Sequence, residues 1–496
     1  MLQFPSSDLA VRLDDKSIYR LSRKLKQNTQ NIYARLKSIE EDSEFVELVF
    51  GIYPNVPKFA NLRCGLWYHA HFDSTCYFKS TDGHTYHWAF SLSRLNLHVL
   101  KTALTSHCVM LVDSTRKGKL FPDSFSKTVP MWCCLMNRVL QHLKFGRMSS
   151  DLKLPTWVHD TEKVQIEERM PEWIDSVLKS GIDFTEFLEL YEKPLQCVWI
   201  SRRTDLDFVD SSFSPDELDF IPVFLVSVSD PDHPVKTTSW EYIQGAGDDH
   251  ETWSLGLTPQ LFWEFKEDIL SPNVHNGEEC EQVVRKILEQ IRKQTSLSSM
   301  QHLYDSSSIS LLHISKNCAD SSIDNELLPT TRLGACPLMI GKFSNFESIE
   351  LLNAYFESHL KECSRFICCY DCTKEVSCGK SFSIMDNKKN KRGLEDELAN
   401  VLEYAETQLE SGKELYVLGR TGKNEEIAIT IAILCSMFTE NYEFVQDKTT
   451  REEMMHHFSS IDKQFIKRKL MFIQSFVHDA APSRNLIKGL NRYFLS

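Results

Sequence analysis

The sequence has no long hydrophobic run, no dense cysteine framework and no excess of basic residues. Its longest apolar stretch, Ile427 to Phe438, spans about twelve residues, whereas a membrane-spanning helix needs about 20. The N-terminal segment carries acidic residues early and no basic region before an apolar one, so neither a signal peptide nor a transit peptide is expected. We therefore predict a cytoplasmic protein with no membrane association.

The cysteine content and the net charge exclude further classes of protein. The 15 cysteines among 496 residues are too sparse for a disulfide scaffold and are expected to be reduced thiols. The chain has 56 Lys and Arg against 69 Asp and Glu, a net charge of −13, which argues against a general polyanion binder. This balance does not exclude a nucleic-acid enzyme, because salt confines the field of a local basic cluster to about 8–10 Å.

Short apolar segments alternate with helical patterns along most of the chain. The patterns predict strands and a tight turn within 62–90, strands at 107–113, 197–201, 223–228 and 415–418, and helices at 8–49, 93–106, 131–145, 160–179, 395–411, 425–438 and 483–494. This alternation is typical of the α/β class. The Ser-rich segment 293–310 lacks apolar periodicity, so we predict one domain over 1–295 and a second over 296–496. We expect 379–394 to be a surface loop.

The segment VDSTRKGK, residues 112–119, follows one of the predicted strands. Hydroxyl groups, backbone N–H groups and cations at the end of a strand suit phosphate binding. The candidate phosphate-binding residues are Ser114, Thr115, Arg116, Lys117 and Lys119, with Lys79 from the CYFKSTDGHT segment as a further cation. A solvated basic loop explains the first group equally well, and an exposed turn explains Lys79. Asp113 is a single carboxylate, unlike the acidic pair of ordinary phosphoribosyltransferases.

A second candidate segment is QGAGDDHETW, residues 244–253. Gly245 and Gly247 permit a sharp backbone turn or a close approach to a ligand. The adjacent carboxylates of Asp248 and Asp249 suit a Mg²⁺ ion carried on phosphates, or a general base. The competing interpretation is an acidic turn in which an Asp caps a helix.

Two further motifs carry weaker signals. The cysteines between Cys363 and Cys378 could form a zinc site, although ordinary reduced thiols explain them more simply. The segment LGRTGKNEE, 418–426, has the strand–loop–helix placement of a phosphatase loop. Gly419 stands where such a loop needs its nucleophilic cysteine, and Glu425 stands where it needs its arginine. We therefore expect no phosphatase activity there.

Several separated blocks resemble one family. They are LRCGLWY (62–68), CYFKSTDGHT (76–85), LNLHV (95–99), VDSTRKGKLFPDSFSKTVPMWC (112–133), YIQGAGDDHETWSLGLTPQLFW (242–263) and SFVHDAAPSRNLIKGLNRYF (475–494). On these blocks the chain resembles the initiator-tRNA phosphoribosyl transferases (tRNA 2′-O-ribosylphosphate transferases) of fungi and plants. The resemblance implies transfer of a phosphoribosyl group from 5-phosphoribosyl 1-diphosphate to the 2′-hydroxyl of adenosine 64 in the T-stem of cytoplasmic initiator tRNA. It also implies a C-terminal domain similar to dual-specificity phosphatases.

The chemistry of this reaction assigns hypothetical roles. Departure of pyrophosphate builds positive charge on the ribose, so the enzyme must hold an anionic donor and neutralise its leaving group with Mg²⁺. We expect the basic loop at 114–119 to hold donor phosphate. Asp248 or Asp249 would bind Mg²⁺ or accept the 2′-hydroxyl proton, and Asp113 competes for either role.

Recognition of a duplex T-stem should depend on shape and charge. The candidate contacts to the tRNA backbone are Arg20, Arg23, Lys24, Lys388, Lys389, Lys391, Arg392, Lys467, Arg468 and Lys469. A non-catalytic RNA-binding scaffold is the alternative function. Such a scaffold would keep the basic clusters but would not need VDSTRKGK together with GAGDD.

Overall fold

A computed structural model describes residues 31–89, 94–116, 118–206, 214–233, 240–305, 328–343, 349–360, 364–369, 374–384, 392–451 and 463–495, without the side chains of 294–305. The chain divides into two compact units. The first comprises Met1–Thr81, Ser106–Val129 and Gln196–Ile314, and the second comprises Asp82–Thr105, Pro130–Leu195 and Ser315–Ser496. Within the described ranges, no helix combines the length and the apolar character that a membrane crossing requires.

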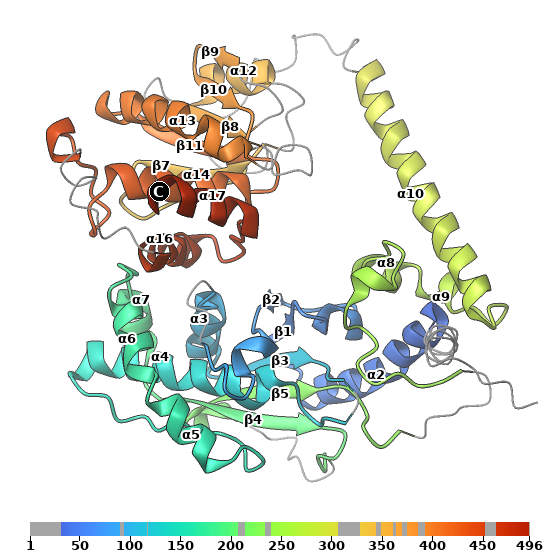
Figure 1. Cartoon of the computed structure of the whole chain (residues 1–496). Coiled ribbons are helices and arrows are strands. Elements are labelled where there is room, and N and C mark those ends of the chain that lie inside the picture. The colour runs from blue at the N-terminus through green and yellow to red at the C-terminus, as the bar shows by residue number, and fades with distance from the viewer. Residues whose placement is uncertain are drawn as a thin grey trace, which may run out of the picture. The chain divides into compact units, whose positions relative to one another are not determined.

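The first unit is built on a five-stranded sheet with the order β2-β1-β3-β5-β4 (Figure 1). Its strands are β1 (Lys58–Asn61), β2 (Ser74–Cys76), β3 (Val109–Asp113), β4 (Leu195–Ser201) and β5 (Ile221–Ser227). Strand β1 pairs in parallel with β2 and β3, and β3 pairs in parallel with β5. Every residue of β3 and β5 is buried, which matches the continuous apolar runs that predicted these strands.

Helices of the first unit pack against one face of this sheet. They are α2 (Ile32–Ile52), α8 (Pro259–Glu264), α9 (Lys266–Ile269) and α10 (Gly277–Asp305). Single helical turns lie elsewhere along the chain at Gly65–Tyr68, Ser80–Gly83, Ser124–Thr128, Pro215–Glu217 and His250–Thr252. Met110 and Val112 of β3 share a core with Phe224 and Val226 of β5 and with apolar residues of these helices. Alternate residues of a strand point to one face, so the other face carries Leu111 and Asp113.

The second unit contains a six-stranded sheet with the order β6-β7-β11-β8-β10-β9. Its strands are β6 (Thr330–Arg332), β7 (Leu338–Lys342), β8 (Ser364–Cys369), β9 (Lys374–Val376), β10 (Gly379–Phe382) and β11 (Glu414–Gly419). The four central strands are parallel, and β6 and β9 are antiparallel edge strands. The helices are α3 (Leu97–Ser106), α4 (Val129–Phe145), α5 (Asp160–Glu167), α6 (Met170–Leu178), α7 (Thr185–Leu190), α12 (Ile349–His359), α13 (Gly393–Glu410), α14 (Glu425–Met437), α16 (Lys463–Phe476) and α17 (Arg484–Leu495).

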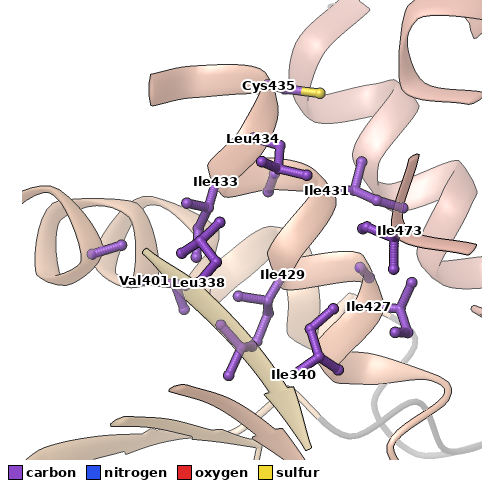
Figure 2. Packing of buried hydrophobic residues seen from close by; sticks show 14 of the residues in the cluster. Leu338, Ile340, Val401, Ile427, Ile429, Ile431, Ile433, Leu434, Cys435 and Ile473 are labelled. Carbon is purple, nitrogen blue, oxygen red and sulfur yellow. The ribbon is translucent and has the colours of Figure 1, made fainter. Parts of the chain in front are cut away.

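This second sheet is covered on both faces. Helices α13, α14, α16 and α17 pack on one face, and α12 packs on the other with Phe366, Tyr416 and Leu418. Figure 2 shows α14 inside this core, where Ile427 and Ile431 lie near Ile473, and Ile433 lies near Val401. A helix that is apolar on all sides must be buried on all sides, and α14 is the central helix of the layer.

The α/β class predicted from the sequence is confirmed, and most predicted elements are present. Part of the helix expected over 8–49 lies outside the described residues, and α2 forms the rest. The prediction of a loop over 379–394 is wrong at its start, because β10 begins at Gly379 and pairs in parallel with β8. The predicted domain boundary falls within α10, and the division at residue 295 stays a prediction.

Candidate active site

Asp113, the last residue of β3, is fully buried at the centre of a hydrogen-bond cluster. Arg63 donates to both carboxylate oxygens, from Nη2 to Oδ1 at 3.0 Å and from Nε to Oδ2 at 3.2 Å. The other donors are Asn61 Nδ2 (2.8 Å), Cys64 Sγ (3.0 Å), Ser124 Oγ (3.2 Å) and the backbone N–H of Ser114 (2.8 Å). A buried carboxylate with this many donors organises the end of the strand and leaves no oxygen free for a substrate.

The segment at 245–249, which carries Asp248 and Asp249 and is called the acidic turn below, follows β5 and lies directly against the end of β3. Gly245 has φ +73°, and a Cβ atom there would lie 2.7 Å from the carbonyl oxygen of Thr115. Only glycine tolerates both the left-handed backbone and this approach. Gln244 holds the two segments together, because its side chain accepts from the N–H of Gly118 (3.1 Å) and donates to the carbonyl oxygen of Lys119 (2.7 Å).

Arg116 joins the two segments by ion pairs. Its Nε lies 2.5 Å from Oδ2 of Asp248, and its Nη2 lies 2.7 Å from Oδ2 of Asp249. Arg63 pairs with the other oxygen of Asp248, with Nη1 3.0 Å from Oδ1. The charges therefore alternate along one chain of contacts, from Asp113 through Arg63, Asp248 and Arg116 to Asp249.

The electrostatic environment differs between the two acids of the turn. Burial alone would raise the pKa of Asp248, but the guanidinium groups of Arg63 and Arg116 outweigh burial and hold the pKa below its ordinary value. The side chain of Asp249 is 65% exposed, against 11% for Asp248. Asp249 also has φ +50°, a strained conformation for a residue with a side chain and one that clusters at functional sites.

A third arginine approaches this turn from α2. Arg35 donates from Nη1 to the carbonyl oxygen of Ala246 at 2.8 Å, and its guanidinium lies 5.3 Å from the centre of the Trp253 ring. The N–H of Gly247 donates to the hydroxyl oxygen of Tyr68 at 3.0 Å. The turn that carries the two acids is therefore fixed by side chains from α2 and from the segment after β1.

The other candidate donor-binding residues differ in how far they are exposed to solvent. Ser114 and Thr115 are buried, whereas the side chain of Lys119 is 53% exposed and pairs with Asp123 at 2.8 Å. Lys79 is half-buried, with Nζ 5.8 Å from the centre of the Tyr77 ring. Lys117 lies outside the described residues.

The residues present fit a Mg²⁺ ion that is held mainly by substrate phosphates rather than by the protein. Both oxygens of Asp248 accept from guanidinium groups, and the described residues contain no group of three or more His, Cys, Asp or Glu that could hold a metal. Mg²⁺ is commonly bound by one or two carboxylates together with substrate phosphates. Asp249, the exposed acid, can either contact a Mg²⁺ ion that arrives with a diphosphate or accept a proton, and a dedicated all-protein metal site does not fit.

The candidate tRNA contacts fall into three groups. Arg20, Arg23, Lys24, Lys388, Lys389 and Lys391 lie outside the described residues. Arg392 and Lys467 are exposed, and Arg468 is half-buried against Phe465. The expectation for Lys469 is wrong, because this residue is only 2% exposed and its Nζ donates to the carbonyl oxygen of Thr439 at 3.2 Å.

The possible zinc site between Cys363 and Cys378 is only partly described. Cys368 and Cys369 are buried on β8, and burial raises the pKa of both thiols. A high thiol pKa opposes the thiolate form that zinc requires. Cys363 and Cys372 lie outside the described residues, so zinc binding by the whole set stays a prediction.

Arg63 is the main functional candidate that the sequence analysis missed. It contacts Asp113 and Asp248, which lie 50 and 185 positions further along the chain, so no local spacing points to this pairing. The one available signal was its place in the block LRCGLWY.

Two family models match the chain: the Rit1 N-terminal domain over residues 25–289 and the Rit1 DUSP-like domain over residues 380–494. The tRNA A64-2′-O-ribosylphosphate transferase of Saccharomyces cerevisiae is 34% identical over 280 residues, which cover 51% of this chain and 55% of that protein. An uncharacterized protein of Schizosaccharomyces pombe is 29% identical over 477 residues, which cover 93% of this chain and 94% of that protein. Since the first model spans more than half of the sequence, the chain belongs to the Rit1 family.

Proposed function

We propose that this protein transfers a 5-phosphoribosyl group from 5-phosphoribosyl 1-diphosphate to the 2′-hydroxyl of adenosine 64 in initiator tRNA, in the cytoplasm. Membership of the Rit1 family and the activity for which the yeast relative is named support this reaction. The observation that carries the proposal is the contact of Arg116 with both Asp248 and Asp249. It joins a candidate phosphate-binding loop to a candidate acid pair in one place.

Arg116 is suited to hold the donor. Its side chain is 66% exposed and pairs with the two carboxylates of the turn, and a guanidinium can exchange a carboxylate for a phosphate with the same two-hydrogen-bond geometry. Lys119 adds an exposed cation on the same loop. Mg²⁺ bound to the diphosphate would neutralise the departing pyrophosphate.

The two acids take different roles in this proposal. Asp248 is held by two guanidinium groups, and its lowered pKa makes it a weak proton acceptor. Asp249 is exposed and can reach solvent or substrate. Asp249 accepts the proton of the 2′-hydroxyl while the 2′-oxygen bonds to C1 of the ribose and the bond from C1 to pyrophosphate breaks. Asp248 orients Arg116, and Asp113 orients Arg63, so neither is the proton acceptor.

The family membership disfavours the alternative of a non-catalytic RNA-binding scaffold. A scaffold has no use for an exposed arginine held between two acids beside a tight glycine turn. Basic residues such as Arg392 and Lys467 serve recognition of the duplex, in which 2′-hydroxyls and phosphates line a shallow minor groove.

The direct test is a transfer assay. The protein is incubated with Mg²⁺, initiator tRNA and donor labelled in its 5-phosphate, and the modified nucleotide is mapped by nuclease digestion. We expect label at A64, and none on the matched tRNA that carries 2′-deoxyadenosine at that position. Failure of the wild-type protein to label A64 would contradict the proposal.

Variants then test the site. Arg116→Ala and Asp248→Ala should each lower transfer on the order of 10²–10³-fold, since each removes a fixed charge beside the reacting groups. Lys179→Ala, an exposed cation outside the candidate site, is the matched control and should keep full activity. Full activity in Arg116→Ala, with an unchanged unfolding curve, would remove Arg116 from the site.

A further inference from the structure

The loop between β11 and α14 contains a buried carboxylate that the proposed transfer reaction does not use. Residues 420–424 connect the end of β11 to the N-terminus of α14, and Glu426 lies in the first turn of that helix. Glu426 is fully buried, and its Oε2 atom has no hydrogen-bond partner. An unpaired buried carboxylate oxygen is costly and calls for an explanation.

The carboxylate points into the loop rather than away from it. Its Oε1 atom accepts a hydrogen bond from the backbone N–H of Asn424 at 3.1 Å. Burial raises the pKa of Glu426 to about 7, and the backbone N–H groups of Glu426, Asn424 and Lys423 oppose this rise by favouring the charged form. Backbone N–H groups gathered at a helix N-terminus form an oxyanion-binding arrangement, and here the N–H of Asn424 donates to the chain's own side chain.

The same carboxylate occupies the volume beside Gly419. A Cβ atom built on Gly419 would lie 1.7 Å from Oε2 and 2.4 Å from Cδ of Glu426. Gly419 stands where a phosphatase loop carries its nucleophilic cysteine, within the part of the chain that matches the Rit1 DUSP-like domain. No cysteine side chain fits at position 419 while Glu426 keeps this conformation. Glu425 stands at the position of the loop arginine, but the carboxylate that points into the loop is that of Glu426, in the first turn of α14.

Neighbouring segments fix the loop in this shape. The N–H of Ala481 donates to the carbonyl oxygen of Lys423 at 2.8 Å, and the N–H of Ser483 donates to Oδ1 of Asn424 at 2.8 Å. Lys423 also pairs with Asp479, with Nζ 2.6 Å from Oδ2. Groups outside the loop therefore hold its shape around the carboxylate, so this shape does not depend on Glu426 alone.

We propose that the loop between β11 and α14 is an oxyanion-binding site that the protein keeps filled with the carboxylate of Glu426. The filled loop neither hydrolyses phosphate esters nor binds phosphate groups of a partner. Removal of the side chain empties the site for a free tetrahedral oxyanion. This inference does not rest on the proposed transfer reaction, whose candidate donor-binding and catalytic residues belong to the other compact unit.

The test uses the full-length protein at pH 8, where the Glu426 carboxylate is charged. Isothermal titration with tungstate, and then with inorganic phosphate, compares the wild type with Glu426→Ala and Glu426→Gln. We expect Glu426→Ala to bind one oxyanion per chain more than the wild type, because the loop N–H groups lose their occupant. Glu426→Gln keeps the shape of the side chain and should bind no additional oxyanion. The stoichiometry is compared between variants because the candidate donor site can bind phosphate in all of them.

An equal number of bound oxyanions in the wild type and Glu426→Ala would overturn the proposal. A second measurement covers the case in which Glu426→Ala does not fold. Gly419→Ala should lower the unfolding temperature strongly in the wild type but much less in a Glu426→Asp background, because the shorter side chain withdraws the carboxylate from position 419. An equal loss in both backgrounds would also overturn the proposal.

Discussion

Asp113 shows how one buried residue can organise the hydrogen bonds of a candidate site. It is fully buried, and Arg63 holds its carboxylate through two nitrogen atoms. Removal of one partner of a buried ion pair leaves the other charge uncompensated. The candidate site therefore depends on Asp113 for its shape.

Asp113→Ala should lower the free energy of unfolding by about 3–5 kcal/mol, the usual effect of breaking a buried pair. Urea unfolding followed by circular dichroism measures the change. Asp232→Ala is the control, because it breaks the exposed pair with Arg203 and should leave the unfolding midpoint almost unchanged. A small effect of Asp113→Ala with loss of all transfer activity would instead favour a direct catalytic role.

The contrast between Asp113 and Arg63 also shows what sequence can reveal at the residue scale. Asp113 ends an apolar strand that the sequence predicts, so its place at the edge of a sheet could be expected. The partner of Asp113 could not be expected, because Arg63 follows β1, the strand that pairs with β3, and also reaches Asp248 in a turn far along the chain. Pairings of this kind depend on the packed sheet and on no local pattern.

A second buried carboxylate links helix α2 to Tyr242, which lies just before the acidic turn. Asp42 accepts a hydrogen bond from the hydroxyl of Tyr242 at 2.7 Å and lies 3.4 Å from Nη2 of Arg202. Burial raises the pKa of Asp42 to about 8, with Arg202 and Tyr242 opposing the rise and the carboxylates of Glu41 and Asp230 adding to it. The folded state therefore binds this proton more tightly than the unfolded state does.

The raised pKa of Asp42 determines whether the stability of the folded protein rises or falls with pH. The stabilisation from protonated Asp42 is complete below the ordinary carboxyl pKa, about 4, and is lost as the pH rises through about 8. Asp42→Asn cannot lose a proton, so its stability relative to the wild type should improve steadily between about pH 5 and pH 8. Urea unfolding midpoints of both proteins across that range measure the difference. A difference that stays constant with pH would contradict this account of Asp42.

The contact between the end of β3 and the acidic turn depends on Gly245. Gly245→Ala should lower the free energy of unfolding by about 1–3 kcal/mol, because the new methyl group meets the carbonyl oxygen of Thr115. Transfer activity should fall as well, since the two segments must separate. Gly146→Ala is the control: that glycine also has a positive φ, +66°, but nothing lies within 4 Å of its Cβ position. Equal effects of the two substitutions would mean that backbone strain alone explains the loss.

Element predictions succeeded where the apolar pattern was long or unbroken. The run HCVMLVD predicts β3, and the apolar run at 425–438 predicts α14, because both elements are buried on every side. Strand β1 was missed because four residues carry too little pattern, and β10 was missed because its GKSF sequence resembles a loop. These strands form because neighbouring parallel strands supply their hydrogen bonds.

At the scale of the whole molecule, a chain with net charge −13 is proposed to bind a polyanion. Binding of initiator tRNA should weaken steeply with salt, because each contact to a phosphate releases a counterion. Arg392→Ala and Lys467→Ala should each reduce the slope of log K against log salt concentration by about 0.7–0.9. Lys179→Ala, an exposed lysine outside the predicted contacts, should leave the slope unchanged. A response to salt that is flat in the wild type would contradict backbone recognition.

The most direct measurement is a crystal structure of the protein with 5-phosphoribosyl 1-diphosphate and Mg²⁺. We predict that the donor lies between the loop at 112–119 and the turn at 245–249, with a donor phosphate on the guanidinium of Arg116, the Mg²⁺ ion on the diphosphate, and the carboxylate of Asp249 left to accept the 2′-hydroxyl proton. A donor bound elsewhere, with Arg116 still paired to Asp248 and Asp249, would contradict this prediction.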